Sequence, residues 1–259
     1  MSWWGKIIGG GFGFMLGGPL GALMGMAAGH QFDKGLHAVN LEPGNTERVQ
    51  LAFFTAVFSV MGYLAKADGT VSRSEIQMAE NIMGQMNLDA EQRKTAIELF
   101  NQGKQNDFPL NDILHQFKTE CHRRTNLLQM FLEILIATAY ADNQLDSAEH
   151  DALKNIAQQI GFSVAQLEQL INMVGAQQQY SHQSNQASST ASLPQAYSVL
   201  GVDSEISDTA LKKTYRRLMS QHHPDKLVAK GLPEEMIKLA NQKTAEIKMA
   251  YEQIKNSRK

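Results

Sequence analysis

The residues best suited to chemistry are a His-Pro-Asp triplet, His223, Pro224 and Asp225, which follows a helical pattern. Proline lacks a backbone N–H and pushes the residue before it toward extended geometry, so the helix should end at Pro224. His223 and Asp225 would then be displayed at a rigid corner beside the preceding helix. The residue pattern predicts this rigid display, with helix termination alone as the alternative interpretation, and we assign no catalytic residue.

The helix before this triplet carries a positively charged face. Residues 208–221 include strong helix formers and no Gly or Pro, and Leu211, Tyr215 and Leu218 share one apolar stripe. Four cations form two i,i+4 rows and a fifth follows the triplet: Lys212, Lys213, Arg216, Arg217 and Lys226. This face could dock on an acidic protein surface or on nucleic-acid phosphates. Nucleic-acid binding leaves the triplet unexplained, so we expect a protein partner and no nucleic acid.

Charge is distributed unevenly along the chain. Residues 193–259 contain 12 Lys and Arg against 8 Asp and Glu, a net charge of +4, whereas residues 1–192 carry a net charge of -6. A basic C-terminal region favours an acidic partner, and a solvated helix face is the alternative interpretation.

Other patterns of catalytic or metal-binding residues fail on geometry. Cys121 and His122 are neighbours, and adjacent side chains on a helix point in different directions, so they rarely form a nucleophile–base pair. The eight histidines show no zinc-site spacing, and no phosphate-binding or dinucleotide-binding loop occurs. We therefore expect no enzymatic activity of the chain itself, no metal and no cofactor.

An uncharged stretch, residues 7–29, follows a short tail of residues 1–6. Its length matches the roughly 30 Å hydrocarbon core of a bilayer. Glycine recurs at every fourth position: Gly5, Gly9, Gly13, Gly17, Gly21, Gly25 and Gly29. Such a ridge lets two membrane helices approach closely. We predict a transmembrane helix that contacts lipid and forms a homodimer; a cleaved signal peptide and a disordered Gly-rich tail are the competing interpretations.

The middle of the chain is helical in pattern. A connector, residues 30–46, leads to residues 47–175, where apolar residues recur at helical spacing. Residues 176–192 are rich in Gln and Ser and predict a flexible linker. Residues 193–259 contain helical patterns on both sides of the triplet. The predicted fold class is all-α: a single N-terminal transmembrane helix, a helical bundle, a flexible linker and a C-terminal helical hairpin.

An internal repeat lies within the bundle, where residues 67–75 align with residues 141–149. Each copy places a capping residue three positions before a glutamate, which predicts a capping box at a helix start: Ser72 with Glu75, and Asp146 with Glu149. A calcium loop of the EF-hand type would need a glutamate at its twelfth position, and neither copy has one. Helix capping is therefore the favoured interpretation and metal binding the alternative.

The C-terminal region resembles a J-domain of the DnaJ family, a match that rests on four segments in matching order: Tyr197-x-x-Leu200-Gly201-Val202, Lys213-x-Tyr215-Arg216-Arg217-Leu218, His223-Pro224-Asp225-Lys226 and Ala250-Tyr251-Glu252. The resemblance implies a co-chaperone that stimulates ATP hydrolysis by a DnaK-type chaperone. It also implies that the triplet activates this partner and that the basic face docks on it. The chain departs from full-length DnaJ in lacking a Gly/Phe-rich region and Cys-x-x-Cys zinc repeats.

The two repeats resemble the helical TerB-like domain of tellurite-resistance proteins, whose ligand here is unknown. Taken whole, the chain resembles the membrane-anchored DnaJ-like co-chaperones of Gram-negative bacteria. That resemblance implies a dimeric protein of the inner membrane, with a periplasmic N-terminus and a cytoplasmic bulk, linked to envelope or capsule-polysaccharide signalling. The alternative is a membrane-tethered scaffold in which the TerB-like domain is the main effector.

Overall fold

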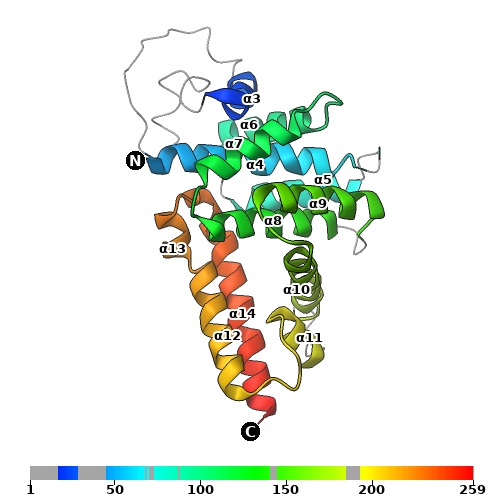
Figure 1. Ribbon diagram of the computed structural model, residues 1–259, viewed down its shortest axis with the longest axis vertical. Coiled ribbons are helices and arrows are strands. Elements are labelled where there is room, and N and C mark those ends of the chain that lie inside the picture. Colours follow the sequence, from blue (N-terminus) through cyan, green and yellow to red (C-terminus); the bar gives the residue numbers. More distant parts are fainter. Residues whose placement is uncertain are drawn as a thin grey trace.

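The computed structural model describes residues 17–28, 45–67, 69, 73–86, 88–140, 145–184 and 193–258. All regular elements in these ranges are helices and none is a strand, which confirms the all-α prediction. A bundle of α4 to α10 carries a smaller C-terminal domain of α11 to α14 that projects from it (Figure 1). The bundle comprises α4 (Asn45–Leu64), α5 (Arg73–Gln85), α6 (Ala90–Gly103), α7 (Leu110–Glu120), α8 (Thr125–Ala139), α9 (Ser147–Ile160) and α10 (Val164–Ser184). The C-terminal domain comprises α11 (Leu193–Val199), α12 (Asp208–His222), α13 (Pro224–Ala229), η3 (Glu234–Met236) and α14 (Ile237–Ser257).

Two apolar helices, α4 and α8, form the centre of the bundle. Phe53 and Phe54 of α4 and Phe131 of α8 are almost completely buried. The rings of Phe117 and Phe131 lie with their centroids 4.7 Å apart and join α7 to α8. Because a helix that is apolar on all sides must be covered on all sides, the other helices surround these two.

The capping box predicted at the second repeat is confirmed. Asp146 accepts a hydrogen bond from the Ala148 N–H (2.7 Å), and the Asp146 N–H donates to Glu149 Oε2 (3.0 Å). The matching prediction for Ser72 and Glu75 cannot be compared, because Ser72 lies outside the described residues. The two hydrogen bonds at Asp146 satisfy N–H groups that a helix start leaves without an intrahelical acceptor.

The C-terminal domain is the predicted helical hairpin, in which α12 and α14 run side by side (Figure 1). Leu211 and Leu218 of α12 meet Ile247 and Ile254 of α14 in a small apolar core. Gly201 ends the short preceding segment with φ +62°, a left-handed conformation that favours glycine. The hairpin places α13 and the end of α12 toward the bundle and the C-terminus away from it (Figure 1).

The predicted linker differs from the structure over its first nine residues, because α10 continues to Ser184. Ala and Gln are good helix formers, so this composition also suits a helix. Tertiary contacts favour the helix: Gln178 Nε2 donates to the Ala137 carbonyl at 2.9 Å, and Ala176 packs against the C-terminal core. Residues 185–192 lie outside the described ranges.

Part of the predicted membrane segment is described as α3 (Gly18–Ala28), which packs on α6 and α7 through Leu20, Leu23, Met24 and Ala27. Gln116 on α7 holds its start, accepting from the Leu20 N–H and donating to the Gly17 carbonyl, both at 2.9 Å. Gly17, Gly21 and Gly25 of the predicted ridge are described, whereas Gly5, Gly9, Gly13 and Gly29 are not. Within the part of the chain that the structure describes, no helix has both the length and the apolar character needed to cross a membrane.

Candidate functional site

The His-Pro-Asp triplet forms the corner between α12 and α13. Helix α12 ends at His222, His223 has extended geometry (φ -60°, ψ 124°), and Pro224 occupies the first turn of α13. The helix end predicted at Pro224 is therefore confirmed. His223 Nδ1 accepts a hydrogen bond from the Asp225 N–H at 3.2 Å, which assigns the ring proton to Nε2. The His223 side chain is 47% exposed and the Asp225 side chain 91% exposed, so both can reach a partner.

The predicted basic face is exposed on one helix and continues past the corner. Lys212, Lys213, Arg216 and Arg217 are exposed on α12. Lys226 on α13 is also exposed, and its Nζ donates to Ser220 Oγ at 2.6 Å across the corner. This hydrogen bond joins the fifth cation to the end of α12, so the exposed cations run along α12 and continue past the triplet onto α13.

The far end of the hairpin is held by Arg258, which sequence reasoning missed. Its guanidinium donates to the Tyr197 hydroxyl (2.9 Å), to Asp208 Oδ1 (2.7 Å) and to the carbonyls of Ile206 and Ser204. These bonds join the end of α14 to α11 and to the start of α12. A lone arginine at the end of a helical pattern carries no signal for such contacts in the sequence.

Beneath the corner, a buried cluster joins the C-terminal domain to the bundle. Glu133 of α8 lies 3.2 Å (Oε2) from Lys243 Nζ of α14 and 3.5 Å (Oε1) from His222 Nε2 of α12. The Glu133 and His222 side chains are only 5% and 3% exposed. The sequence did carry a signal, since Glu133 is the only charged residue in the apolar helix α8.

Burial and charge set the ionisation of this cluster. Burial alone would raise the pKa of Glu133, but His222, Lys243 and a hydrogen bond from Gln129 outweigh it, so the pKa lies below its ordinary value. Burial lowers the pKa of His222, with Glu133 opposing and Lys243 and Arg217 adding to the shift. Lys243, whose Nζ lies 3.2 Å from Glu133 Oε2, favours the ionised carboxylate, and burial favours the neutral ring of His222.

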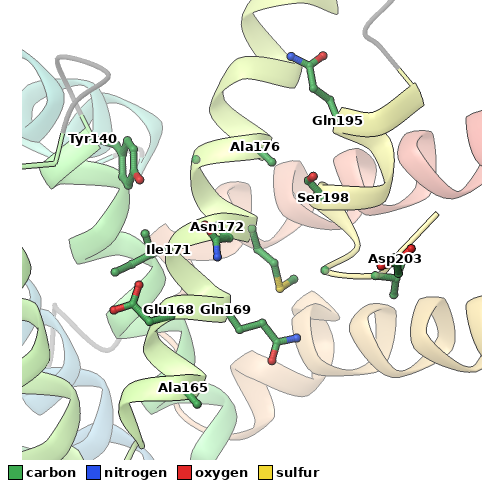
Figure 2. A pocket seen from close by; sticks show the side chains of 14 residues that line it. Tyr140, Ala165, Glu168, Gln169, Ile171, Asn172, Ala176, Gln195, Ser198 and Asp203 are labelled. Carbon is green, nitrogen blue, oxygen red and sulfur yellow. The ribbon is translucent and has the colours of Figure 1, made fainter. Parts of the chain in front are cut away.

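A cleft of about 890 Å³ lies between α10 of the bundle and α11 with the loop that follows it. Figure 2 shows residues of α10 on one wall and Gln195, Ser198 and Asp203 on the other. Burial, with Glu168 nearby, raises the pKa of Tyr140 at its rim. The lining side chains present amides and separate carboxylates without a nucleophile–base pair. No group of His, Cys, Asp or Glu within the described ranges could hold a metal ion.

Cys121 lies in the core at the end of α7. Burial raises the pKa of its thiol to about 12, so little thiolate forms near neutral pH. His122 is exposed while Cys121 is buried, which agrees with the prediction of a structural cysteine.

Three family models match the chain: "Co-chaperone DjlA transmembrane domain" over residues 1–39, "Tellurite resistance protein TerB" over residues 54–172 and "DnaJ domain" over residues 195–259. Curated relatives named "Co-chaperone protein DjlA" match almost end to end. Those of Photobacterium profundum, Coxiella burnetii and Escherichia coli K12 are 43%, 44% and 41% identical, covering 98%, 100% and 100% of this chain and 99% of each relative. No solved structure matches the chain significantly.

Proposed function

Because the chain belongs to the DjlA family of co-chaperones, we propose that it stimulates ATP hydrolysis by a cytosolic DnaK-type chaperone. The observation that carries this proposal is the exposed His223–Asp225 corner beside an exposed row of cations. The cations attract an acidic surface of the partner and orient it, and the corner then contacts the partner at a fixed geometry. The chain itself hydrolyses nothing in this mechanism.

The test is single-turnover ATP hydrolysis by the cognate DnaK, with and without this chain. The wild-type chain should accelerate hydrolysis and His223→Gln should not. His122→Gln is the matched control, because it makes the same change at another exposed histidine and should behave as wild type. Equal stimulation by wild type and His223→Gln would contradict the proposal.

The basic face has its own signature in this assay. Electrostatic steering weakens as salt rises, because ions screen charges over a Debye length of about 10 Å at 0.1 M ionic strength. Replacing Arg216 and Arg217 together by Gln should therefore raise the concentration of the chain that gives half-maximal stimulation at low salt. It should also make this concentration depend less on salt. An unchanged salt dependence would remove these two arginines from the docking face.

We also propose that residues 7–29 anchor the chain in the bacterial inner membrane, with the N-terminus periplasmic and the bulk cytoplasmic. Support comes from the match of residues 1–39 to a transmembrane-domain model and from the uncharged stretch itself. The cytoplasmic placement follows from the partner, since ATP and DnaK are there.

Dimerisation through the glycine ridge completes the proposed membrane arrangement. Gly21→Ile would insert a branched side chain into the ridge and should weaken self-association in membranes. Ala22→Ile is the matched control, since residue 22 follows the ridge position and points to another side of the helix. Equal self-association of both variants would argue against the ridge.

The family resemblance also leads us to place this activity in envelope or capsule-polysaccharide signalling, with the TerB-like bundle recruiting an unidentified ligand. A chain that ends at residue 184 keeps α10 whole and removes the J-domain. If signalling depends on DnaK, this truncation and His223→Gln should give the same phenotype. A truncation that signals normally would instead make the bundle the effector.

A further inference from the structure

The loop end of the J-domain is embedded in the bundle rather than suspended from a linker. Leu227, Leu232, Met236 and Ala240 are buried, and they belong to the same apolar core as α4 and α8. Gly231 packs so closely on Val49 that a Cβ there would lie 2.8 Å from a Val49 methyl carbon. Apolar burial of this extent holds the two domains in one arrangement.

Hydrogen bonds to Asn126 of α8 hold the chain on both sides of the triplet. Asn126 Nδ2 donates to the Gln221 carbonyl at 2.9 Å, two residues before His223. The same amide accepts through Oδ1 from Lys230 Nζ at 3.0 Å, just after α13. One asparagine of the bundle therefore ties the end of α12 to the end of α13, the two helices that meet at the corner.

Glu133 adds a contact that only this docked arrangement can satisfy. A buried carboxylate is costly unless it is paired. Gln129 of α8 donates to Glu133 Oε1 at 2.8 Å, but the two partners that can carry positive charge both come from the J-domain: Lys243 at 3.2 Å and His222 at 3.5 Å. His222 directly precedes His223, so the contact between Glu133 and His222 lies next to the activating motif. If the J-domain swung away, Glu133 would face solvent from an otherwise apolar surface.

The docked arrangement leaves the proposed partner face open. His223, Asp225 and the five cations of α12 and α13 are exposed, whereas Asn126 of α8 contacts the chain on both sides of the corner through Gln221 and Lys230. The bundle therefore holds the J-domain from behind without occupying the surface that the partner needs.

We propose that Glu133 and Asn126 of the bundle are positioning residues for the His-Pro-Asp corner, so that the docked J-domain is the form that binds and activates the DnaK-type partner. This inference rests on the proposed function. Docking fixes the orientation of the corner before the partner arrives, which removes an ordering cost from binding. An undocked molecule must find this orientation first.

The inference predicts a specific kinetic pattern. If only the docked fraction is competent, a variant that is docked one tenth of the time needs about tenfold more protein for half-maximal stimulation. The rate at saturation should stay at the wild-type value, because the bound partner selects docked molecules. Damage to the corner itself would instead lower the saturating rate, as we expect for His223→Gln.

The experiment uses the full chain in lipid nanodiscs and titrates it against single-turnover hydrolysis by DnaK. Glu133→Gln should raise the half-maximal concentration about tenfold. Glu98→Gln, the same change at an exposed position of α6, should not. Glu133→Gln combined with Lys243→Gln leaves no unpaired buried charge and should recover most of the loss, whereas adding Lys248→Gln, at an exposed position of α14, should not.

Docking itself is read by a second measurement. Gln92 Nε2 donates to Glu235 Oε1 across the interface at 2.9 Å, so cysteines at these two positions should be joined by a short bismaleimide. Cross-linking should fall in Glu133→Gln and Asn126→Ala and return in the Glu133–Lys243 double variant. This readout needs no chaperone, and circular dichroism of each variant distinguishes undocking from unfolding.

The outcomes separate the two proposals. A raised half-maximal concentration together with reduced cross-linking supports positioning. Reduced cross-linking with an unchanged or improved titration curve overturns it, because docking would then be neutral or inhibitory for activation. Unchanged cross-linking in both Glu133→Gln and Asn126→Ala also overturns it. No stimulation by the wild-type chain would contradict the proposed function, while the cross-link would still report docking.

Discussion

Gly62 of α4 and Gly103 of α6 mark the point where the backbones of these two helices meet. A Cβ on Gly62 would collide with the Phe100 carbonyl, and a Cβ on Gly103 would collide with the Ser59 carbonyl. Each clash is with backbone, which cannot rotate away as a side chain can. The crossing therefore requires glycine on both helices, and it places α6, which contacts the J-domain through Gln92, against the central helix α4.

Gly62→Ala and Gly103→Ala should each destabilise the chain by about 3 kcal/mol, because overpacking at a helix crossing forces the backbones apart. The measurement is urea unfolding followed by circular dichroism. Gly84→Ala is the matched control: it also lies within a helix, but a Cβ there meets nothing within 4 Å. We expect that variant to be more stable by about 0.5–1 kcal/mol. If all three variants behaved alike, the close crossing of α4 and α6 would be wrong.

The stack of Tyr215 on Tyr251 should account for part of the stability of the hairpin. The ring centroids lie 4.1 Å apart and the planes differ by 12°. A double-mutant cycle with Tyr215→Leu and Tyr251→Leu should give a coupling of about 1 kcal/mol beyond the loss of buried area. Tyr215→Phe keeps the ring and should show nearly wild-type stability. Additive effects of the two leucine variants would mean that the rings do not support each other.

Acid should loosen the docking of the J-domain. The groups facing His222 are Glu133 of α8, Lys243 of α14 and Arg217 of α12, and burial lowers the pKa of His222 in the docked chain. A lowered pKa means that the docked state favours the neutral ring. The resulting stability is complete above a pH of about 6.5, the ordinary pKa of histidine, and is lost as the pH falls below it. The pKa of Glu133 is also lowered, so protonation of its carboxylate below about pH 4.5 acts in the same direction.

The check is cross-linking between cysteines at positions 92 and 235, measured at about pH 7.5 and about pH 5.5, on either side of the ordinary histidine pKa. The yield of cross-linked chain should be lower at the lower pH. Maleimide reacts more slowly in acid, so this yield is first corrected by the rate measured on a pair of exposed cysteines. His222→Gln cannot be protonated and should remove most of the fall. A larger fall in His222→Gln than in wild type would reverse the sign of this prediction.

Features encoded by neighbouring residues could be predicted from the sequence. The helix end at Pro224, the basic rows of α12 and the capping box of Asp146 with Glu149 all depend on local spacing, and the structure contains all three. Local spacing succeeds here because proline geometry, helical periodicity and capping act over only a few residues.

Features that depend on distant partners could not be predicted. Nothing near Glu133 in the sequence indicates that its partners are His222 and Lys243, and Arg258 gives no hint that it reaches four groups around α11 and α12. The Gln-rich residues after Gly175 suit both a linker and a helix by composition. Contacts with Ala137 and with the C-terminal core decide for the helix up to Ser184.

The docked position of α3 and a membrane span expose different side chains of this helix to water. In the docked position, Ala22 and Met26 are exposed to water, Met26 at 64%, while Leu23 is buried against the bundle. In a bilayer all three would be surrounded by lipid. Cysteines at positions 22 and 26 therefore distinguish the two arrangements by their reaction with a maleimide that cannot cross membranes.

In inverted inner-membrane vesicles, Ala22→Cys and Met26→Cys should remain unlabelled if residues 7–29 span the bilayer, because maleimide reacts with thiolates and a thiol in hydrocarbon stays protonated and out of reach. Glu98→Cys, on the exposed face of α6, should label in the same vesicles and not in intact cells, which also reports the orientation of the bulk. The native Cys121 adds little background, since it is buried and the pKa of its thiol is raised to about 12. Rapid labelling at positions 22 and 26 would instead place α3 on the bundle in water, and the anchor would then have to be sought outside residues 18–28.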